Sequence, residues 1–278
     1  AGSNSNNGLY YSTDGKSWNR SNITSGSFRS VYNANGIWIT NSFDDGYGLY
    51  YSTDGKVWTQ SNITSGDFNY IYNANGIWVA CGNSTVIGIY YSTDGKSWTK
   101  SNIGASFIAV YSTVNIMVVG NVNEDVYYST DGKVWAQSNI DEGYFYTVYN
   151  ANGIWVSCSG DGIYYSTDGK VWSHVLNKSI INSVYNANGI WVACSDNNEG
   201  IFYSIEGKVW AQSNIDEGYF YTVYNANGIW VAGSSNNTLP GGLLYSTDGK
   251  VWYEADIPDD AFYTVYNANG IWVAGSNS

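Results

Sequence analysis

Three pairs of adjacent acids are the side chains in this sequence best suited to acid–base chemistry. They are Asp141 with Glu142, Asp216 with Glu217, and Asp259 with Asp260. Cleavage of a glycoside requires two carboxylates on opposite sides of the scissile bond, about 5 to 10 Å apart. Neighbouring acids on an exposed loop do not provide this arrangement. One Asp-Glu-Gly-Tyr-Phe loop also occurs twice, which suits repeated contact sites better than a single catalytic centre, so we expect no enzyme activity.

The other nucleophiles and metal ligands are also few. His174 is the single histidine, and Cys81, Cys158 and Cys194 occupy the same position in three repeats. An odd number of cysteines at equivalent positions fits buried free thiols better than a disulfide framework. Phosphate-binding glycine loops of the usual spacing are absent as well. The sequence therefore predicts no metal site, no cofactor and no disulfide.

A short turn motif recurs along the whole chain and organises it. Its first copy is Ser12-Thr13-Asp14-Gly15-Lys16-Ser17-Trp18, and the motif returns at intervals of about 40 residues. The acids of the seven copies are Asp14, Asp54, Asp94, Asp131, Asp168, Glu206 and Asp248. In a tight turn, Asp or Ser can bond the backbone two residues on and Gly accepts a positive φ. Each copy is therefore predicted to be a structural turn whose Trp anchors the following strand.

A second turn alternates with the first, beginning with Tyr32-Asn33-Ala34-Asn35-Gly36-Ile37-Trp38. Asn-Gly between two apolar runs is a strong signal for a β-hairpin, because a type I′ turn needs positive φ at both central residues. Each repeat then has four strands, exemplified by residues 28–32, 37–40, 48–52 and 57–60. The copy at residues 111–117 lacks the Gly and the Trp, and we expect a less regular hairpin there.

Seven four-stranded antiparallel repeats predict an all-β fold, a seven-bladed β-propeller that forms one domain over residues 1–278. The competing arrangement is a solenoid, which would need atypical repeats as caps at its ends. The chain begins with two outer strands and finishes with two inner strands. We therefore expect the ring to close by pairing the N-terminal outer strands with the C-terminal inner strands in one blade.

One position in the innermost strands varies between repeats while its neighbours stay nearly constant. It follows the Phe that opens the strand, and its occupants are Arg29, Asn69, Ile108, Tyr146, Asn182, Tyr221 and Tyr263. These residues are expected to surround the mouth of the central channel, where a ligand could touch several blades. The candidate ligand-binding residues are Arg29, Asn69, Tyr146, Asn182, Tyr221 and Tyr263. The alternative is that the same side chains only plug the channel.

The charge of the chain restricts its partners. There are 11 Lys and Arg against 23 Asp and Glu, a formal net charge of −12, which makes nucleic acids and anionic membranes poor partners. No apolar run is long enough for a membrane span. The turn acids are balanced by seven lysines, so the excess acids fall mostly in loops on the opposite face. That face is acidic, rich in Asn and variable, features that suit recognition or simple solubility.

The Ser-x-Asp-Gly-x-x-Trp turn resembles the Asp-box, or bacterial neuraminidase repeat, of sialidase-like propellers. The resemblance covers all seven repeats, with a departure at Ile205-Glu206, and implies a rim position for the box, away from the ligand. Sialidase chemistry in that family needs three arginines around the substrate carboxylate. Arg20 and Arg29 are the only arginines here, so the sequence argues against sialidase activity.

A non-catalytic, lectin-like module that binds a carbohydrate or cell-surface ligand is the function we expect. Asn, Asp and Tyr on variable loops suit sugar hydroxyls and ring faces, and protein recognition uses the same residues. Protein binding, or a repeat scaffold without a ligand, is the alternative, and a glycoside hydrolase is the third choice. The composition resembles repeat propellers of bacterial surface and phage tail or adhesion proteins. This resemblance implies an extracellular or virion location, and we expect a monomer.

Overall fold

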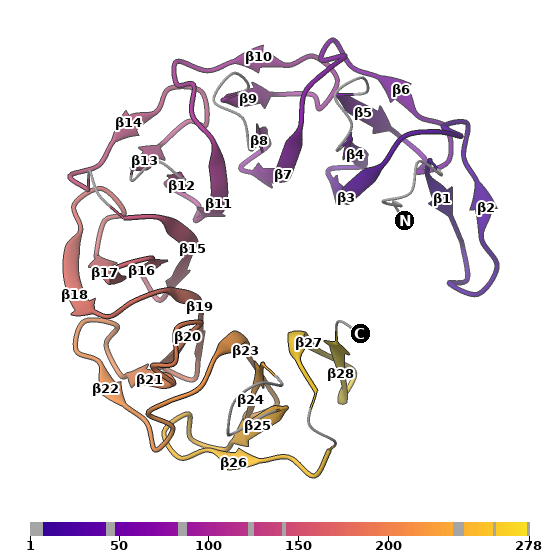
Figure 1. The fold of residues 1–278 in the computed structure, drawn as a ribbon. Coiled ribbons are helices and arrows are strands. Elements are labelled where there is room, and N and C mark those ends of the chain that lie inside the picture. Colours follow the sequence, from indigo (N-terminus) through magenta and orange to yellow (C-terminus); the bar gives the residue numbers. More distant parts are fainter. Residues whose placement is uncertain are drawn as a thin grey trace. The chain divides into compact units, whose positions relative to one another are not determined.

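The computed structural model describes residues 8–42, 48–82, 88–121, 125–140, 143–235, 242–257 and 260–276. These residues form β-strands and connecting turns, and they include no helix that could cross a membrane. The chain divides into two compact units, residues 1–123 with 127–137, and residues 124–126 with 138–278. The first unit holds the strands up to β14, and the second holds β15 to β28 (Figure 1). A single domain over residues 1–278 stays a prediction.

Six antiparallel sheets of four strands repeat along the chain, and each follows the chain order of its strands. We call each sheet a blade and number its strands from first to fourth. The first unit contains the blades β3 (Phe28–Ala34), β4 (Ile37–Ser42), β5 (Leu49–Ser52), β6 (Thr59–Gln60); β7 (Phe68–Ala74), β8 (Ile77–Gly82), β9 (Ile89–Ser92), β10 (Thr99–Lys100); and β11 (Phe107–Ser112), β12 (Met117–Asn121), β13 (Val126–Ser129), β14 (Ala136–Gln137).

The second unit repeats this plan. Its blades are β15 (Phe145–Ala151), β16 (Ile154–Ser159), β17 (Gly162–Ser166), β18 (Ser173–Asn177); β19 (Ile181–Ala187), β20 (Ile190–Ser195), β21 (Ile201–Ser204), β22 (Ala211–Gln212); and β23 (Phe220–Ala226), β24 (Ile229–Ser234), β25 (Leu243–Ser246), β26 (Tyr253–Glu254). Compared with the strands expected from sequence, the first strand is longer and the fourth is usually only two residues long. The fourth strand is short because the turn before it takes up the residues ahead of it.

Two further sheets have two strands each. One is β1 (Tyr10–Tyr11) with β2 (Asn19–Arg20), which correspond to the third and fourth strands of a blade. The other is β27 (Phe262–Ala268) with β28 (Ile271–Ser276), which correspond to the first and second strands. Both halves of a seventh blade are therefore present. Their pairing into one sheet stays a prediction.

The Asn-Gly hairpins have the geometry expected from the sequence. Asn35 and Gly36 between β3 and β4 have φ values of 52° and 77°, and the other Asn-Gly pairs repeat these values closely. Both positions therefore require residues that tolerate the left-handed region. In the hairpin that lacks this pair, β11 already ends at Ser112, which pairs with Met117.

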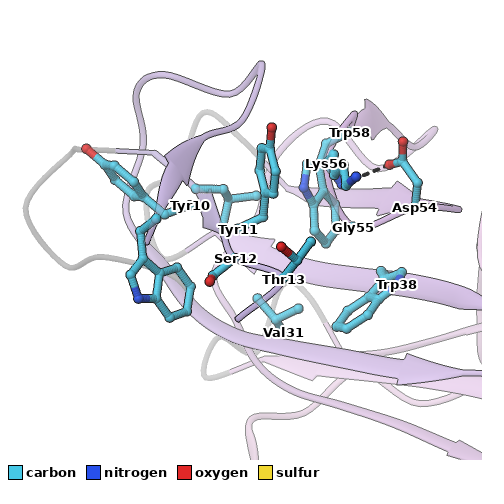
Figure 2. Close-up of a pocket in the computed structure, with 12 residues that line it drawn as sticks. Tyr10, Tyr11, Ser12, Thr13, Val31, Trp38, Asp54, Gly55, Lys56 and Trp58 are labelled. Atoms are coloured by element: carbon cyan, nitrogen blue, oxygen red, sulfur yellow. Dashed lines mark hydrogen bonds between the residues drawn. The ribbon is translucent and has the colours of Figure 1, made fainter. Parts of the chain in front are cut away.

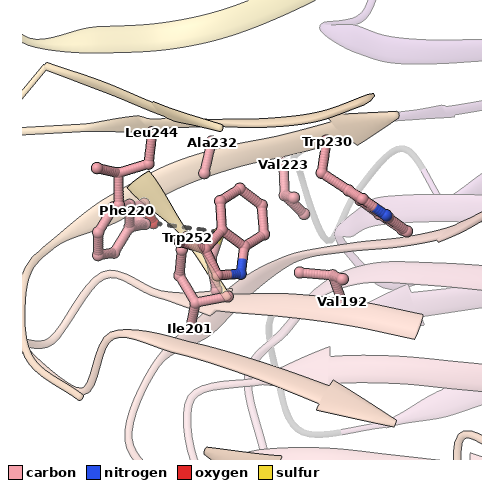
Figure 3. Close-up of a cluster of buried hydrophobic side chains, with 9 residues drawn as sticks. Val192, Ile201, Phe220, Val223, Trp230, Ala232, Leu244 and Trp252 are labelled. Atoms are coloured by element: carbon pink, nitrogen blue, oxygen red, sulfur yellow. Dashed lines mark hydrogen bonds between the residues drawn. The ribbon is translucent and has the colours of Figure 1, made fainter. Parts of the chain in front are cut away.

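The hydrophobic core lies between successive blades. In one cluster, Trp252 of the turn before β26 packs with Phe220 and Trp230 of its own blade and with Val192 and Ile201 of the preceding blade (Figure 3). Such large aromatic side chains contribute most of the apolar area buried between neighbouring sheets. The turn Trp thus anchors its blade, as the sequence indicates.

Two tryptophans of the first unit are exposed. The Trp before β6 is 6% exposed, whereas its equivalent before β2, Trp18, is 51% exposed. Trp38 on β4 is 37% exposed. Trp18 and Trp38 are therefore exceptions among the tryptophans, most of which are buried.

Candidate functional site

The recurring turn is held by its own side chains. In the copy between β5 and β6, Ser52 Oγ accepts the N–H groups of Asp54 and Gly55, and Asp54 Oδ1 accepts those of Lys56 and Val57 at 2.8 and 2.9 Å. The hydrogen bonds from Val57 and Lys56 lower the pKa of the Asp54 carboxyl. The same pattern holds for five further acids: Asp14, Asp94, Asp131, Asp168 and Asp248.

Glu206 is the exception that the sequence shows. Gly207 N–H still bonds Ser204 Oγ at 2.8 Å, but within the described blade no hydrogen bond involves the Glu206 carboxylate. The extra methylene of Glu moves the carboxylate away from the backbone amides that Asp reaches. Six of the seven acids thus stabilise their turns. In each of the six, Oδ1 is occupied by backbone hydrogen bonds and is not free to bind a ligand.

The turn lysines are engaged with the preceding sheet. Lys56 Nζ lies 5.8 Å from the ring centroid of Tyr11, and Lys96 Nζ lies 5.8 Å from that of Tyr51. Lys250 makes the same contact with Tyr203 at 5.7 Å. Cation–π contacts of this kind are worth about 0.5 to 1 kcal/mol at exposed sites. The lysines therefore connect blades as well as balancing the turn acids.

A second link between blades was not foreseen from the sequence. Asn62 Nδ2 donates to the carbonyl of Trp98 at 2.8 Å, and Asn62 Oδ1 accepts the N–H of Trp98 at 2.8 Å. Equivalent asparagine clamps join Asn22 to Trp58, Asn102 to Trp135, Asn139 to Trp172, and Asn214 to Trp252. The available signal was an Asn four residues after the turn Trp in most repeats.

The variable position singled out in the sequence is a β-bulge in every first strand. In β15, Phe145 pairs with Ser159 and Thr147 pairs with Cys158, so Tyr146 has no partner in the ladder. The same register shift occurs at the equivalent residue of the other six first strands. A bulge redirects the side chain and frees it from cross-strand packing. This explains why the residue type varies there, and we call these seven residues the bulge column.

Four members of the bulge column belong to the second unit, and their side chains are described. The rings of Tyr221 and Tyr263 stack with centroids 4.4 Å apart and planes 20° apart. Tyr146 contacts the ring of Tyr144 at 5.0 Å. Asn182 Oδ1 is 3.9 Å from Cys194 Sγ, at the limit of a weak hydrogen bond. The structure thus brings Tyr221 and Tyr263 together, with Tyr263 45% exposed.

In the first unit the bulge column is described by its backbone. Arg29, Asn69 and Ile108 each stand at the bulge of their first strand, and their side chains lie outside the description. Their roles as ligand-binding residues stay predictions.

The loops around the bulge column lie together at one end of each blade, as expected from the sequence. In the second unit the loop after each second strand bonds the segment before the first strand, at Gly160 N–H to Tyr144 O, Asp196 N–H to Ile180 O, and Ser235 N–H to Tyr219 O. These bonds are 2.9 to 3.0 Å long. Residues of the loop after the second strand and of the segment before the first strand are therefore placed next to the bulges, where they can contribute to one surface.

The three acid pairs are described only in part. Asp216 and Glu217 are both exposed, and Asp141, Glu142 and Asp259 lie outside the described residues. His174 is exposed on β18, where its ring stacks on Tyr164 at 4.5 Å. Within the described ranges no three His, Cys, Asp or Glu side chains converge in a way that could hold a metal ion.

The cysteines are free and buried, as the sequence indicates. Cys81, Cys158 and Cys194 lie at equivalent positions of second strands with at most 1% exposure. Burial raises the pKa of Cys81 to about 12 and raises the pKa of the other two thiols. Such thiols are poor nucleophiles and serve as core side chains.

A pocket of about 230 Å³ lies beside β1 in the first unit (Figure 2). Its lining includes Tyr11 and Trp18 from the two-stranded sheet, and Trp38, Gly55 and Lys56 from the next blade. In complete blades the second strand of the preceding blade lies against this turn glycine: Gly95, for example, would meet Ile37 within 2.9 Å if it carried a Cβ. The pocket therefore occupies the position that corresponds to the second strand of a preceding blade elsewhere in the repeat.

Comparison with known proteins addresses the fold. No protein-family model matches the sequence, and no curated protein matches it. Among solved structures, the computationally designed Ika8 protein has a TM-score of 0.69 at 11% identity, with 90% of this chain and 81% of that chain covered. The WD40 β-propeller domain of Doa1 has a TM-score of 0.55 at 13% identity, with 90% of each chain covered. YCF48 bound to D1 peptide has a TM-score of 0.56 at 14% identity, with 91% of this chain and 92% of that chain covered. At these identities the likeness concerns the fold alone, and it agrees with the blades described above: this chain has the all-β architecture of a β-propeller.

Proposed function

We propose that this chain is a non-catalytic binding module and that the bulge column is its recognition surface. The observation that carries the proposal is that every first strand bulges at the position whose residue type varies. The ladder fixes the residues on either side, Phe145 and Thr147 in β15, and leaves Tyr146 between them. A repeated scaffold with one free position per blade, next to two sets of loops, is a suitable design for binding.

A carbohydrate is the ligand that we place first. The stacked rings of Tyr221 and Tyr263 present aromatic surface on which a sugar ring could lie, and Tyr263 is exposed. The half-buried Asn182 adds an amide that can both donate to and accept from hydroxyls. Aromatic faces with a few polar groups are the usual composition of small-molecule sites.

The turn geometry supports assigning the repeats to the Asp-box type. Asp54 and its five equivalents accept backbone hydrogen bonds within the turn, and the lysines beside them contact the preceding blade. This leaves the boxes in a structural role. Of the two arginines, Arg20 donates to the carbonyl of Thr24 at 2.5 Å, so no arginine triad for a substrate carboxylate is proposed.

A protein or peptide ligand is the second candidate. It is favoured by the likeness to YCF48, which was solved bound to D1 peptide, and by the tyrosines of the bulge column, which are common in protein-binding surfaces. Either ligand fits the extracellular or virion surface location that we propose from the resemblance to surface and adhesion repeats. A repeat scaffold without a ligand is the third candidate, and it would be favoured if neither a glycan nor a peptide ligand were found.

A ligand screen with one triple variant tests the proposal. The wild-type chain is applied to a glycan array with and without calcium and to a peptide array. Any ligand found is then measured against Tyr146→Ala/Tyr221→Ala/Tyr263→Ala, whose unchanged circular dichroism and melting would show an intact fold. We expect loss of binding. A matched triple variant of two exposed tyrosines on the third and fourth strands and an exposed valine in the turn between them, Tyr245→Ala/Tyr253→Ala/Val251→Ala, should bind normally. Retained affinity in the first triple variant would move the site to other loops, and turnover of any glycoside would contradict a non-catalytic role.

A further inference from the structure

Asp196 is anchored beside the bulge column. Strand β20 ends at Ser195, which pairs with Ile181, and the N–H of Asp196 bonds the carbonyl of Ile180 at 3.0 Å. Asp196 therefore lies at the end of the blade where β20 ends and β19 begins, next to the bulge residue Asn182. It is half-buried. The carboxylate is thus held at the surface that we propose for binding.

Tyrosines from the two flanking blades lie near this carboxylate. Burial raises the pKa of Tyr146, and repulsion from Tyr144 and from the Asp196 carboxylate raises it further. Burial also raises the pKa of Tyr221, against a hydrogen bond with Ser235, and Asp196 again adds to the rise. Strand β19 packs against both β15 and β23. Because Asp196 is anchored at the start of β19, it stands between the strands that carry Tyr146 and Tyr221 at their bulges. Tyr263, stacked on Tyr221, extends the aromatic surface.

The Asp196 carboxylate has no cationic partner among the described residues. Lys178, in the segment between β18 and β19, has its ammonium 4.0 Å from Glu199 and 5.8 Å from the ring of Phe202. Three turn lysines lie over third-strand tyrosines: Lys56 over Tyr11, Lys96 over Tyr51 and Lys250 over Tyr203. A half-buried carboxylate without a counter-charge is unfavourable, and burial raises the pKa of Asp196 accordingly. A cationic ligand would remove that cost.

We propose that Asp196, Tyr146 and Tyr221 form a receptor for an organic ammonium group, with the carboxylate as the counter-ion and the two phenol rings around the alkyl groups. A carboxylate combined with aromatic rings is complementary to ammonium groups, because cations are attracted to ring faces and the alkyl groups need apolar contact. This inference rests on the proposed function, since it names the chemical class of ligand for the same surface. The ammonium can belong to a free amine or to a lysine side chain.

Binding of matched charged and neutral probes tests the proposal. Choline is titrated by calorimetry and by ligand-observed NMR, beside its neutral carbon analogue 3,3-dimethyl-1-butanol. The peptide Gly-Gly-Lys-Gly-Gly with blocked ends is the second cationic probe, and its norleucine counterpart is the neutral control. We expect both cations to bind and both neutral analogues to bind at least tenfold more weakly. Choline alone binding would identify small amines as the ligand source, and stronger binding of the peptide would identify protein lysines.

Two single variants test whether the Asp196 carboxylate is responsible for choline binding. Asp196→Asn keeps the size of the side chain and removes the charge, and should weaken choline binding by about tenfold or more, as expected for loss of a partly desolvated counter-ion. Asp216→Asn changes an exposed acid of a neighbouring loop and should leave binding unchanged. Equal binding of choline and its neutral analogue, or equal affinity in Asp196→Asn and wild type, would overturn the inference.

These results separate the inference from the proposed function. If a glycan or peptide found by array still needs Tyr146, Tyr221 and Tyr263 but binds Asp196→Asn normally, the bulge column is a binding surface and the ammonium receptor is wrong. If choline binds through Asp196 but the triple tyrosine variant keeps its array ligand, the ammonium site stands and the array ligand binds elsewhere.

Discussion

Asn22 and Trp58 are joined by a pair of hydrogen bonds between two sheets. The Asn22 amide donates to the Trp58 carbonyl at 2.8 Å and accepts the Trp58 N–H at 2.7 Å. Trp58 follows a turn whose other amides are bonded by Asp54. Asn22 therefore provides hydrogen-bond partners for the backbone N–H and C=O groups of Trp58, the residue between that turn and β6. These partners come from the preceding sheet.

Removing one clamp should destabilise the fold without changing the turn. We expect Asn62→Ala to lower the free energy of unfolding by about 2 kcal/mol, because it deletes two hydrogen bonds to Trp98 and each contributes about 1 kcal/mol. Urea unfolding followed by tryptophan fluorescence measures the change. Asn177→Ala, at an exposed position on β18, is the control and should be near neutral. Equal midpoints for the two variants would show that the clamp contributes nothing.

The clamp also shows a limit of sequence reasoning. Both turn motifs and the four-strand repeat could be predicted, because Asn35-Gly36 and Asp54-Gly55 encode local backbone conformations that need no partner. The role of Asn62 depends on which backbone lies opposite in the next blade, which no local rule provides. In the repeat that ends with β18 the equivalent residue is Leu176, within that strand, and no asparagine clamps Trp210 among the described residues.

The variable position in the first strands could be read from the sequence, but its bulged backbone could not, and its role as a binding site stays a prediction. The variability of Tyr146 and its equivalents pointed to a free position, and the structure supplies the reason, a bulge in each first strand. The neighbourhood of Asp196 could not be predicted, because it depends on how the loop after β20 is anchored to Ile180. The two longest-range features of the site, the Tyr221–Tyr263 stack and the Asp196 environment, both arise from packing between blades.

Two glycines with the same backbone conformation separate local strain from packing between blades. Gly153 and Gly249 have φ of +81° and +73°, but a Cβ on Gly153 would meet nothing within 4 Å, whereas on Gly249 it would lie 2.9 Å from Val192 and 3.2 Å from Trp230. Gly153→Ala should cost about 1 kcal/mol from positive φ alone. Gly249→Ala should cost roughly 1 to 3 kcal/mol more from overpacking. Thermal melts of both variants measure the difference, and equal losses would mean that the neighbouring side chains move aside freely.

The lowered pKa values of the turn acids predict that the fold loses stability at low pH. Backbone hydrogen bonds lower the folded-state pKa of Asp54 below its usual value, and the acids of five other turns are shifted in the same direction. A lowered folded-state pKa stabilises the fold above the unfolded pKa, and this contribution is lost as pH falls through the folded value. The unfolding midpoint in urea should therefore decrease below about pH 4.

A substitution in one turn assigns that pH dependence. Asp54→Asn should lower stability at pH 7 and make the decrease below pH 4 less steep, since one of the shifted carboxyls is gone. Asp196 has the opposite effect, because burial raises its pKa and protonation relieves that cost, so Asp196→Asn should not flatten the decrease. A pH profile unchanged by Asp54→Asn would assign the acid sensitivity to other carboxyls.

Ring closure by β28 and β1 stays a prediction, and the repeat gives its register. In a complete blade Trp38 pairs with Ser52, Ile39 with Tyr51 and Thr40 with Tyr50. The equivalent pairs in the seventh blade are Trp272 with Ser12, Val273 with Tyr11, and Ala274 with Tyr10. The side chains of Ile271 and Val273 are 68% and 65% exposed in β28. In a closed ring they would pack against the turn at Gly55, in the same way as Ile37 and Ile39 pack against the turn at Gly95.

Engineered cysteines test that register. The variant Tyr10→Cys/Ala274→Cys places two thiols at opposed positions and should form an intramolecular disulfide under mild oxidation at high dilution, detected by peptide mapping, because opposed strand positions are within the roughly 4.4 to 6.8 Å that a disulfide spans between Cα atoms. The native cysteines are buried and should not take part. Tyr11→Cys/Ala274→Cys shifts the register by one residue, which points the two side chains to opposite faces of the sheet, and should not crosslink. Crosslinking of both variants, or disulfides formed only between chains, would contradict closure within one molecule.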